Sequence, residues 1–134
     1  MQSTRSLLRA VLCAALLVFL TECAAIEKYY LEQGTGIFAE QNKVLEAFTS
    51  VVEVFEERED YKTADELYEA KDRLDDACKP LRSVSLLRFL GKVVSDVLSM
   101  EAFRSFDSCE EATLKAKGEL NRIAPKLASL YLEP

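Results

Sequence analysis

The chain has 134 residues, of which 49% are hydrophobic and 30% are charged, and its formal net charge is -6 at pH 7. It contains no histidine, which excludes a Ser-His-Asp or Cys-His nucleophile and a histidine-based zinc site. The acidic balance argues against nucleic acid or anionic lipid as a general partner and favours basic protein surfaces.

The first 25 residues have the pattern of a secretory signal peptide. Arg5 and Arg9 precede an apolar run over residues 10–20, and small residues follow that run. The run is shorter than a membrane span, which needs about 20 apolar residues, so we predict export without membrane insertion. Cleavage is expected after Ala25, with cleavage after Cys23 as the alternative. A buried N-terminal helix is the competing interpretation of this segment.

Residues 26–134 are predicted to form the mature protein, a single helical domain with 15 basic and 22 acidic side chains. Two of the four cysteines leave with the signal peptide, so Cys78 and Cys109 remain. In an oxidising secretory route such a pair predicts one intramolecular disulfide, and an intermolecular bridge is the alternative. Closing this loop should stabilise the fold by roughly 3 to 4 kcal/mol.

Every periodic segment of the mature chain has the pattern of a helix. We therefore predict an all-α fold, an irregular bundle of four to five helices stapled by one disulfide. A short helix over residues 26–33 is expected to end at a turn containing Gly34 and Gly36. The next helix, over residues 37–57, carries apolar side chains at spacings of three and four, which indicates one buried stripe.

Capping patterns and prolines mark two further helices. One is predicted to begin at a capping box formed by Thr63 and Glu66 and to stop at Pro80. The last is predicted to begin at a second capping box that starts at Ser108. Pro125 lies inside its apolar stripe, so a kink or a break into two shorter helices is expected there.

The segment 86–103 is apolar around nearly its whole circumference, which is typical of a helix buried on most sides. A straight helix of about 18 residues would cover roughly 27 Å. A disulfide tolerates less than about 7 Å between its α-carbons. Cys78 and Cys109 stand before and after this segment, so a straight helix would keep them too far apart for a disulfide. The chain must therefore bend, with Gly91 as the candidate position, or return in extended form over residues 101–107.

The charge of the mature chain is concentrated in one segment, residues 53–76, which we call the acidic ridge. It contains 11 acidic and four basic side chains, and the charges of the remaining mature chain cancel. Such a ridge can steer the protein toward a basic patch on a partner. A solvated face that only keeps the protein soluble is the alternative. The candidate partner-binding residues are Glu56, Glu57, Glu59, Asp60, Tyr61 and Tyr68.

No cofactor, metal site or catalytic constellation is predicted. Asp72 and Asp76 lie one helical turn apart, but acidic helix surfaces produce such pairs by default, and no EF-hand loop is present. Two classes of function remain. One is a secreted protein that binds another protein, and the other is a carrier that encloses a small hydrophobic ligand. The aromatic residues available either to line such a cavity or to fill a core are Phe38, Phe48, Phe55, Phe89 and Phe103.

The chain combines a short signal peptide, a small acidic helical body, and the segments Ile26-Glu27-Lys28-Tyr29-Tyr30 and Cys109-Glu110-Glu111-Ala112. In these features it resembles the anophensin and albicin group of anopheline mosquito salivary proteins. The resemblance implies a saliva protein that inhibits host defence by protein-protein binding. Its partner would be a host plasma protein or complex. That partner would be either the convertase of the alternative complement pathway or a component of the contact system that generates kinins. The resemblance carries over no binding residue. The secretoglobins are similar in outline, but they pair chains through terminal cysteines. Cys78 and Cys109 are not placed for such pairing, so we expect a monomer.

Overall fold

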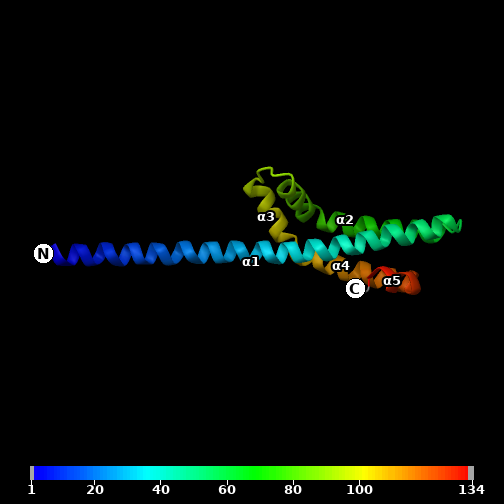
Figure 1. Cartoon of the computed structure of the whole chain (residues 1–134), viewed down its shortest axis with the longest axis horizontal. Helices are drawn as coiled ribbons and strands as arrows, with labels where there is room; N and C mark the ends of the chain where they lie inside the picture. The colour runs from blue at the N-terminus through cyan, green and yellow to red at the C-terminus, as the bar shows by residue number, and fades with distance from the viewer. Residues whose placement is uncertain (1, 133–134) are drawn as a thin grey trace. The chain divides into compact units, whose positions relative to one another are not determined.

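The computed structural model describes the backbone of residues 2–132 and the side chains of residue 28 and residues 30–132. The described backbone is all-α, as predicted, and contains no strand (Figure 1). The side chains of the predicted signal peptide and its cleavage sites lie outside the described residues. No described helix has the length and hydropathy needed to cross a membrane. The helices are α1 (Gln2–Glu57), α2 (Tyr61–Phe89), α3 (Asp96–Arg104), α4 (Phe106–Ile123) and α5 (Pro125–Leu132).

The chain divides into two compact units, Met1–Gln33 and Gly34–Pro134, and the second contains the described core. In this unit α1, α2 and α4 present apolar stripes to one another. Buried side chains recur along each stripe at spacings of three and four, which is the repeat of a helix with one inward face. The largest fully buried apolar side chains are Phe48 from α1, Leu67 and Leu74 from α2, and Leu120 from α4.

The predicted turn at Gly34 and Gly36 is wrong, because α1 continues through both residues. Gly34 is buried, and a β-carbon added to it would lie 2.8 Å from Cζ of Phe106 and 3.5 Å from Cδ1 of Leu81. The missing side chain lets the ring of Phe106, the first residue of α4, approach α1 closely. A glycine in a helix costs about 1 kcal/mol relative to alanine, which the packing of a long apolar stripe can outweigh.

Cys78 of α2 and Cys109 of α4 form the predicted intramolecular disulfide, with α-carbons 4.7 Å apart. The predicted stop at Pro80 is wrong, since α2 continues beyond it to Phe89. Proline removes one backbone hydrogen bond and crowds the preceding turn of a helix. Leu81 and Val84 follow Pro80 and are both buried, so their packing holds the helix together despite this local cost.

The prediction of one buried helix over residues 86–103 is also wrong. The chain bends at Gly91, which has a φ of 66°, and α3 starts after Ser95, whose Oγ accepts a hydrogen bond from the Leu98 N–H at 3.2 Å. Figure 1 shows the last turns of α2 and the start of α3 lying away from α4, and the outer side chains of these segments are exposed. We call these exposed side chains the apolar corner: Leu86, Phe89, Leu90, Val93, Val97 and Met100.

The helix starts differ from the predicted capping boxes. Asp60 caps α2 three residues before the predicted cap Thr63, whose N–H it accepts at 3.2 Å. α4 begins at Phe106, and Ser108 lies within its first turn and donates to a carbonyl instead of capping. The predicted break at Pro125 is confirmed. Proline stands at the first position of α5, where a helix has no backbone hydrogen bond for it to remove.

One polar side chain lies in the core without a hydrogen-bond partner in the described part of the chain. Gln41 is 0% exposed, and neither its Nε2 nor its Oε1 is bonded. It stands one heptad after Gly34 and one heptad before Phe48, on the inward stripe of α1. An unbonded buried amide costs about 1 to 3 kcal/mol. An apolar side chain of the same volume at position 41 would therefore give a more stable core.

We predict that Gln41→Met raises the free energy of unfolding by about 1 to 3 kcal/mol, because it keeps the volume and removes the unbonded amide. Urea unfolding followed by circular dichroism measures this change. Gln33→Met, at a half-buried position of the same helix, is the control and should change the stability by less than about 0.5 kcal/mol. A destabilised Gln41→Met protein would contradict the prediction.

We also predict opposite effects of adding a methyl group at two helical glycines. Gly34→Ala should lower the stability, because displacing the ring of Phe106 costs about 1 to 3 kcal/mol and this outweighs the roughly 1 kcal/mol that alanine gains in a helix. Gly118→Ala in α4 should raise it by up to about 1 kcal/mol, since nothing lies within 4 Å of the added carbon. Thermal unfolding of both variants measures the contrast, and equal shifts would show that Gly34 is not a packing position.

Candidate functional site

The turn between α1 and α2 is a Schellman motif, in which the last carbonyls of a helix accept from the residues that follow it. The N–H of Asp60 donates to the carbonyl of Phe55 at 2.9 Å, and the N–H of Glu59 donates to that of Glu56 at 3.0 Å. Glu59 takes the left-handed position, with a φ of 58°, where glycine is usual. A non-glycine residue costs about 1 to 2 kcal/mol there. We call residues 56–61 the acidic tip.

Two carboxylates of the acidic tip have structural partners. Asp60 accepts from the N–H of Thr63 at 3.2 Å and from its hydroxyl at 2.8 Å, so it caps α2. Glu56 Oε1 accepts from the hydroxyl of Tyr68 at 3.1 Å, which links α1 to α2. These two side chains therefore hold the turn in place and are partly committed to the fold.

The other two carboxylates of the acidic tip, Glu57 and Glu59, are exposed. Neither makes a side-chain hydrogen bond or an ion pair within the described part of the chain. Tyr61 follows the turn with 62% of its surface exposed. The acidic tip thus presents two uncommitted negative charges and an aromatic side chain to solvent.

Farther along α2, the acidic ridge is partly neutralised by arginine. The bond to Glu66 holds the pKa of Arg122 above its ordinary value, with a further contribution from the charge of that carboxylate. These surface pairs are worth little stability individually. Asp65, Asp72 and Asp76 have no ion pair within the described part of the chain, so uncompensated charge remains along α2 as well as at the turn. Three carboxylates of the ridge lie within 4 Å of an arginine: Glu66 with Arg122, Glu69 with Arg73, and Asp75 with Arg82.

The six candidate partner-binding residues predicted from the sequence lie at one end of the α1–α2 hairpin (Figure 1). Five are consecutive or nearly so in the turn, and Tyr68 reaches back to Glu56 from the second turn of α2. Their spacing in the sequence was sufficient to place them together. The division into structural carboxylates and uncommitted ones required the three-dimensional structure.

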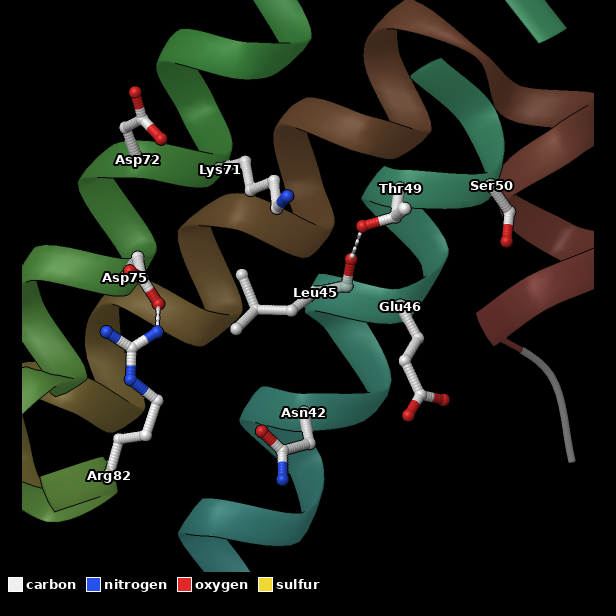
Figure 2. Close-up of a pocket in the computed structure, with 9 residues that line it drawn as sticks. All are labelled: Asn42, Leu45, Glu46, Thr49, Ser50, Lys71, Asp72, Asp75 and Arg82. Atoms are coloured by element: carbon white, nitrogen blue, oxygen red, sulfur yellow. Dashed lines mark hydrogen bonds and ion pairs between the residues drawn. The ribbon is translucent and has the colours of Figure 1, made fainter. Parts of the chain in front are cut away.

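A groove of about 620 Å³ lies between α1 and α2 (Figure 2). Figure 2 shows the side chain of Leu45 pointing across the groove and the ion pair of Asp75 and Arg82 at its edge. Its walls carry carboxylates, cations and hydroxyl groups, so it offers hydrogen bonds rather than an apolar enclosure. It is lined by Asn42, Leu45, Glu46, Thr49, Ser50, Lys71, Asp72, Asp75 and Arg82.

The five phenylalanines considered for a carrier do not share one cavity. Phe48 is fully buried in the core, Phe38 and Phe55 are half-buried against it, and Phe89 is 87% exposed. Phe103 stacks edge to face on Phe106, with ring centroids 5.6 Å apart. These rings therefore fill the core or lie on the surface. Among the described residues no group of three or more metal-binding side chains is placed to hold an ion.

Sequence reasoning missed the apolar corner as a surface feature. Its residues were assigned to a buried helix because apolar character alone does not say which elements are available to cover it. A charge signal was present in the sequence. The segment 86–103 contains four charged side chains, Arg88, Lys92, Asp96 and Glu101, which is unusual for a helix buried on most sides.

The hydrogen bond from Tyr68 gives a test of the acidic tip in solution. The bond to Glu56, then burial, then the charges of Glu56, Glu53 and Asp65 raise the pKa of Tyr68. We predict that Glu56→Gln lowers this pKa toward its ordinary value, because the charged acceptor stabilises the protonated phenol. Ultraviolet absorbance of the phenolate against pH measures it. Glu57→Gln is the control, and an equal effect of both variants would contradict the bond.

No family model, no curated protein and no solved structure matches the chain. The function is therefore inferred from the uncommitted carboxylates of the acidic tip and from Tyr61 and Tyr68 beside them.

Proposed function

We propose that this chain is a secreted, non-catalytic binding protein that inhibits host defence, and that the acidic tip docks on a basic patch of a host plasma protein or complex. The observation that carries the proposal is the pair Glu57 and Glu59, which are exposed and have no partner in the described part of the chain. Glu59 also occupies a backbone position that glycine would adopt with less strain.

Electrostatics support this choice of surface. The acidic tip contains four carboxylates and one arginine, Arg58, so its net charge is negative. A cluster with a net charge attracts an oppositely charged patch and accelerates the encounter, whereas paired carboxylates contribute little. Tyr61 and Tyr68 stand beside the cluster with 62% and 41% of their surfaces exposed. Tyrosine supplies apolar contact area together with a hydroxyl, and it is common at the energetic centres of interfaces. The acidic tip thus combines a steering charge with anchors.

The resemblance to the anophensin and albicin group supports two targets. One is the convertase of the alternative complement pathway, and the other is the contact-phase system that generates kinins. Blocking either would require a rigid surface that covers a larger complex. The disulfide between Cys78 and Cys109 gives the helical body that rigidity. On this proposal the protein acts in saliva, outside the cell, as a monomer.

The test compares charge reversal at two places that have the same effect on net charge. Glu57→Lys with Glu59→Lys changes the acidic tip without touching the cap Asp60 or the bond to Glu56. Glu110→Lys with Glu111→Lys changes two exposed carboxylates of α4. Both proteins are added to assays of alternative-pathway haemolysis and of contact-phase kallikrein generation in vertebrate plasma. We predict that the tip variant inhibits about tenfold more weakly than the unmodified protein, and that this difference increases at low salt.

The α4 variant should inhibit like the unmodified protein. Affinity capture from the same plasma, with the unmodified chain as bait, should retain a partner that the tip variant loses. Equal inhibition by both variants at low ionic strength would reject the acidic tip as the docking surface. Lack of inhibition by the unmodified chain in both assays would reject the two proposed targets.

A further inference from the structure

The apolar corner is the largest group of exposed apolar side chains in the described part of the chain. Phe89 is 87% exposed, Val93 is 95% exposed and Val97 is 70% exposed. They surround the bend at Gly91, where α2 ends and residues 92–95 lead into α3. Scattered apolar residues are normal on a surface, but a contiguous apolar patch indicates an interaction site.

The charges on the α2 side of the corner and in the bend are positive, whereas Asp96 and Glu101 stand beside Val97 and Met100 on the α3 side. Residues 77–95 contain four basic side chains and no acidic one, and the next carboxylate is Asp96 in the first turn of α3. Arg88 and Lys92 flank Phe89 and Val93 in the sequence and are exposed. Neither cation makes an ion pair within the described part of the chain. The α2 side of the corner, with Phe89, Leu90 and Val93, is therefore an apolar surface with two uncommitted positive charges.

We propose that the apolar corner docks on an anionic phospholipid surface. The side chains of Phe89, Leu90 and Val93 enter the boundary between headgroups and acyl chains. Arg88 and Lys92 stay at the level of the lipid phosphates, where each cation contributes about a factor of five to binding. The contact is peripheral, in keeping with the finding that no described helix is suited to cross a membrane.

The chemistry of the corner favours lipid over a second copy of the chain. A symmetric pair of corners would bring Arg88 and Lys92 of both copies together, and like charges at an interface cost free energy. The corner also favours lipid over another protein. None of its six side chains carries a hydrogen-bonding group, whereas protein interfaces make about one hydrogen bond per 100 to 200 Å².

The acidity of the whole chain does not prevent this contact. The acidic tip lies at the other end of α2, and a helix of 29 residues is about 43 Å long at 1.5 Å per residue. The Debye length at physiological salt is about 8 Å. The charges of the acidic tip are therefore screened from a membrane that the corner touches. Asp75, which lies closer to the corner, is paired with Arg82. Asp96 and Glu101 lie on α3 beside Val97 and Met100, which are not among the three side chains that enter the lipid.

The test uses the absence of tryptophan from the chain. The whole chain is expressed in a secreting eukaryotic host and used in the form that the host releases. Phe89→Trp then supplies a single tryptophan at an exposed position, which can be excited selectively beside the five tyrosines. Vesicles of phosphatidylcholine with 30% phosphatidylserine, about the anionic content that gives a plasma-membrane surface potential, should shift its emission to shorter wavelength. Leu114→Trp, at a 65% exposed position on α4, is the matched control and should not shift.

Two further variants separate the apolar and the charged contributions. Phe89→Ser with Val93→Ser should reduce sedimentation with the anionic vesicles at least tenfold, since both side chains leave water on binding. Arg88→Gln with Lys92→Gln should reduce it about 30-fold on anionic vesicles and leave the weak binding to pure phosphatidylcholine unchanged. All four positions are exposed, so these variants should keep the circular dichroism spectrum of the unmodified protein.

Several outcomes would overturn the proposal. One is an unchanged emission of Phe89→Trp with the anionic vesicles. Another is equal vesicle binding by the unmodified and the serine variants, which would place the lipid contact elsewhere. A third is self-association in sedimentation velocity that Phe89→Ser abolishes while vesicles have no effect, because the corner would then bind a second copy. These results leave the inhibition assays for the acidic tip unaffected, so the two proposals fail separately.

Discussion

The disulfide between Cys78 and Cys109 is the constraint on which the rest of the described fold depends. It holds the middle of α2 within 4.7 Å, α-carbon to α-carbon, of the first turn of α4. Yet α2 continues beyond Cys78 to Phe89, which carries the chain about 16 Å away from the crosslink at 1.5 Å per residue. The chain must therefore double back within the 31 residues that separate the two cysteines. Gly91 supplies the bend, and α3 returns to the start of α4.

This return path explains why so many apolar side chains are exposed. The bend lies beyond the core that α1, α2 and α4 form, so no helix of the unit Gly34–Pro134 covers the outer faces of the last turns of α2 and of α3 in its described part. The same segment contains the positive charges of residues 77–95. α2 thus separates two surfaces of opposite character, the acidic tip at its beginning and the apolar corner at its end. The two surfaces suit different kinds of partner.

The core combines close packing with local costs. Gly34 and Pro80 both weaken a helix, and Gln41 buries an amide without a partner in the described chain. Buried side chains flank Pro80 and Gln41 on their inward stripes, and Gly34 is covered by Phe106 and Leu81 from other helices, so packing outweighs each local penalty. Helix stability in this protein therefore comes mainly from tertiary packing. That is also why glycine and proline were poor guides to where its helices end.

The sequence by itself determined the helical class, the pairing of Cys78 with Cys109, the break at Pro125 and the place of the acidic tip. Each follows from a local pattern: a repeat of three and four, a count of cysteines, a missing N–H, or a run of carboxylates. Tertiary structure decided that α1 passes through Gly34, that α2 passes through Pro80, and that the apolar segment around Gly91 is exposed. These outcomes depend on which residues from distant parts of the chain meet. Phe106 against Gly34 is one such contact, and neither residue's own neighbours in the sequence specify it.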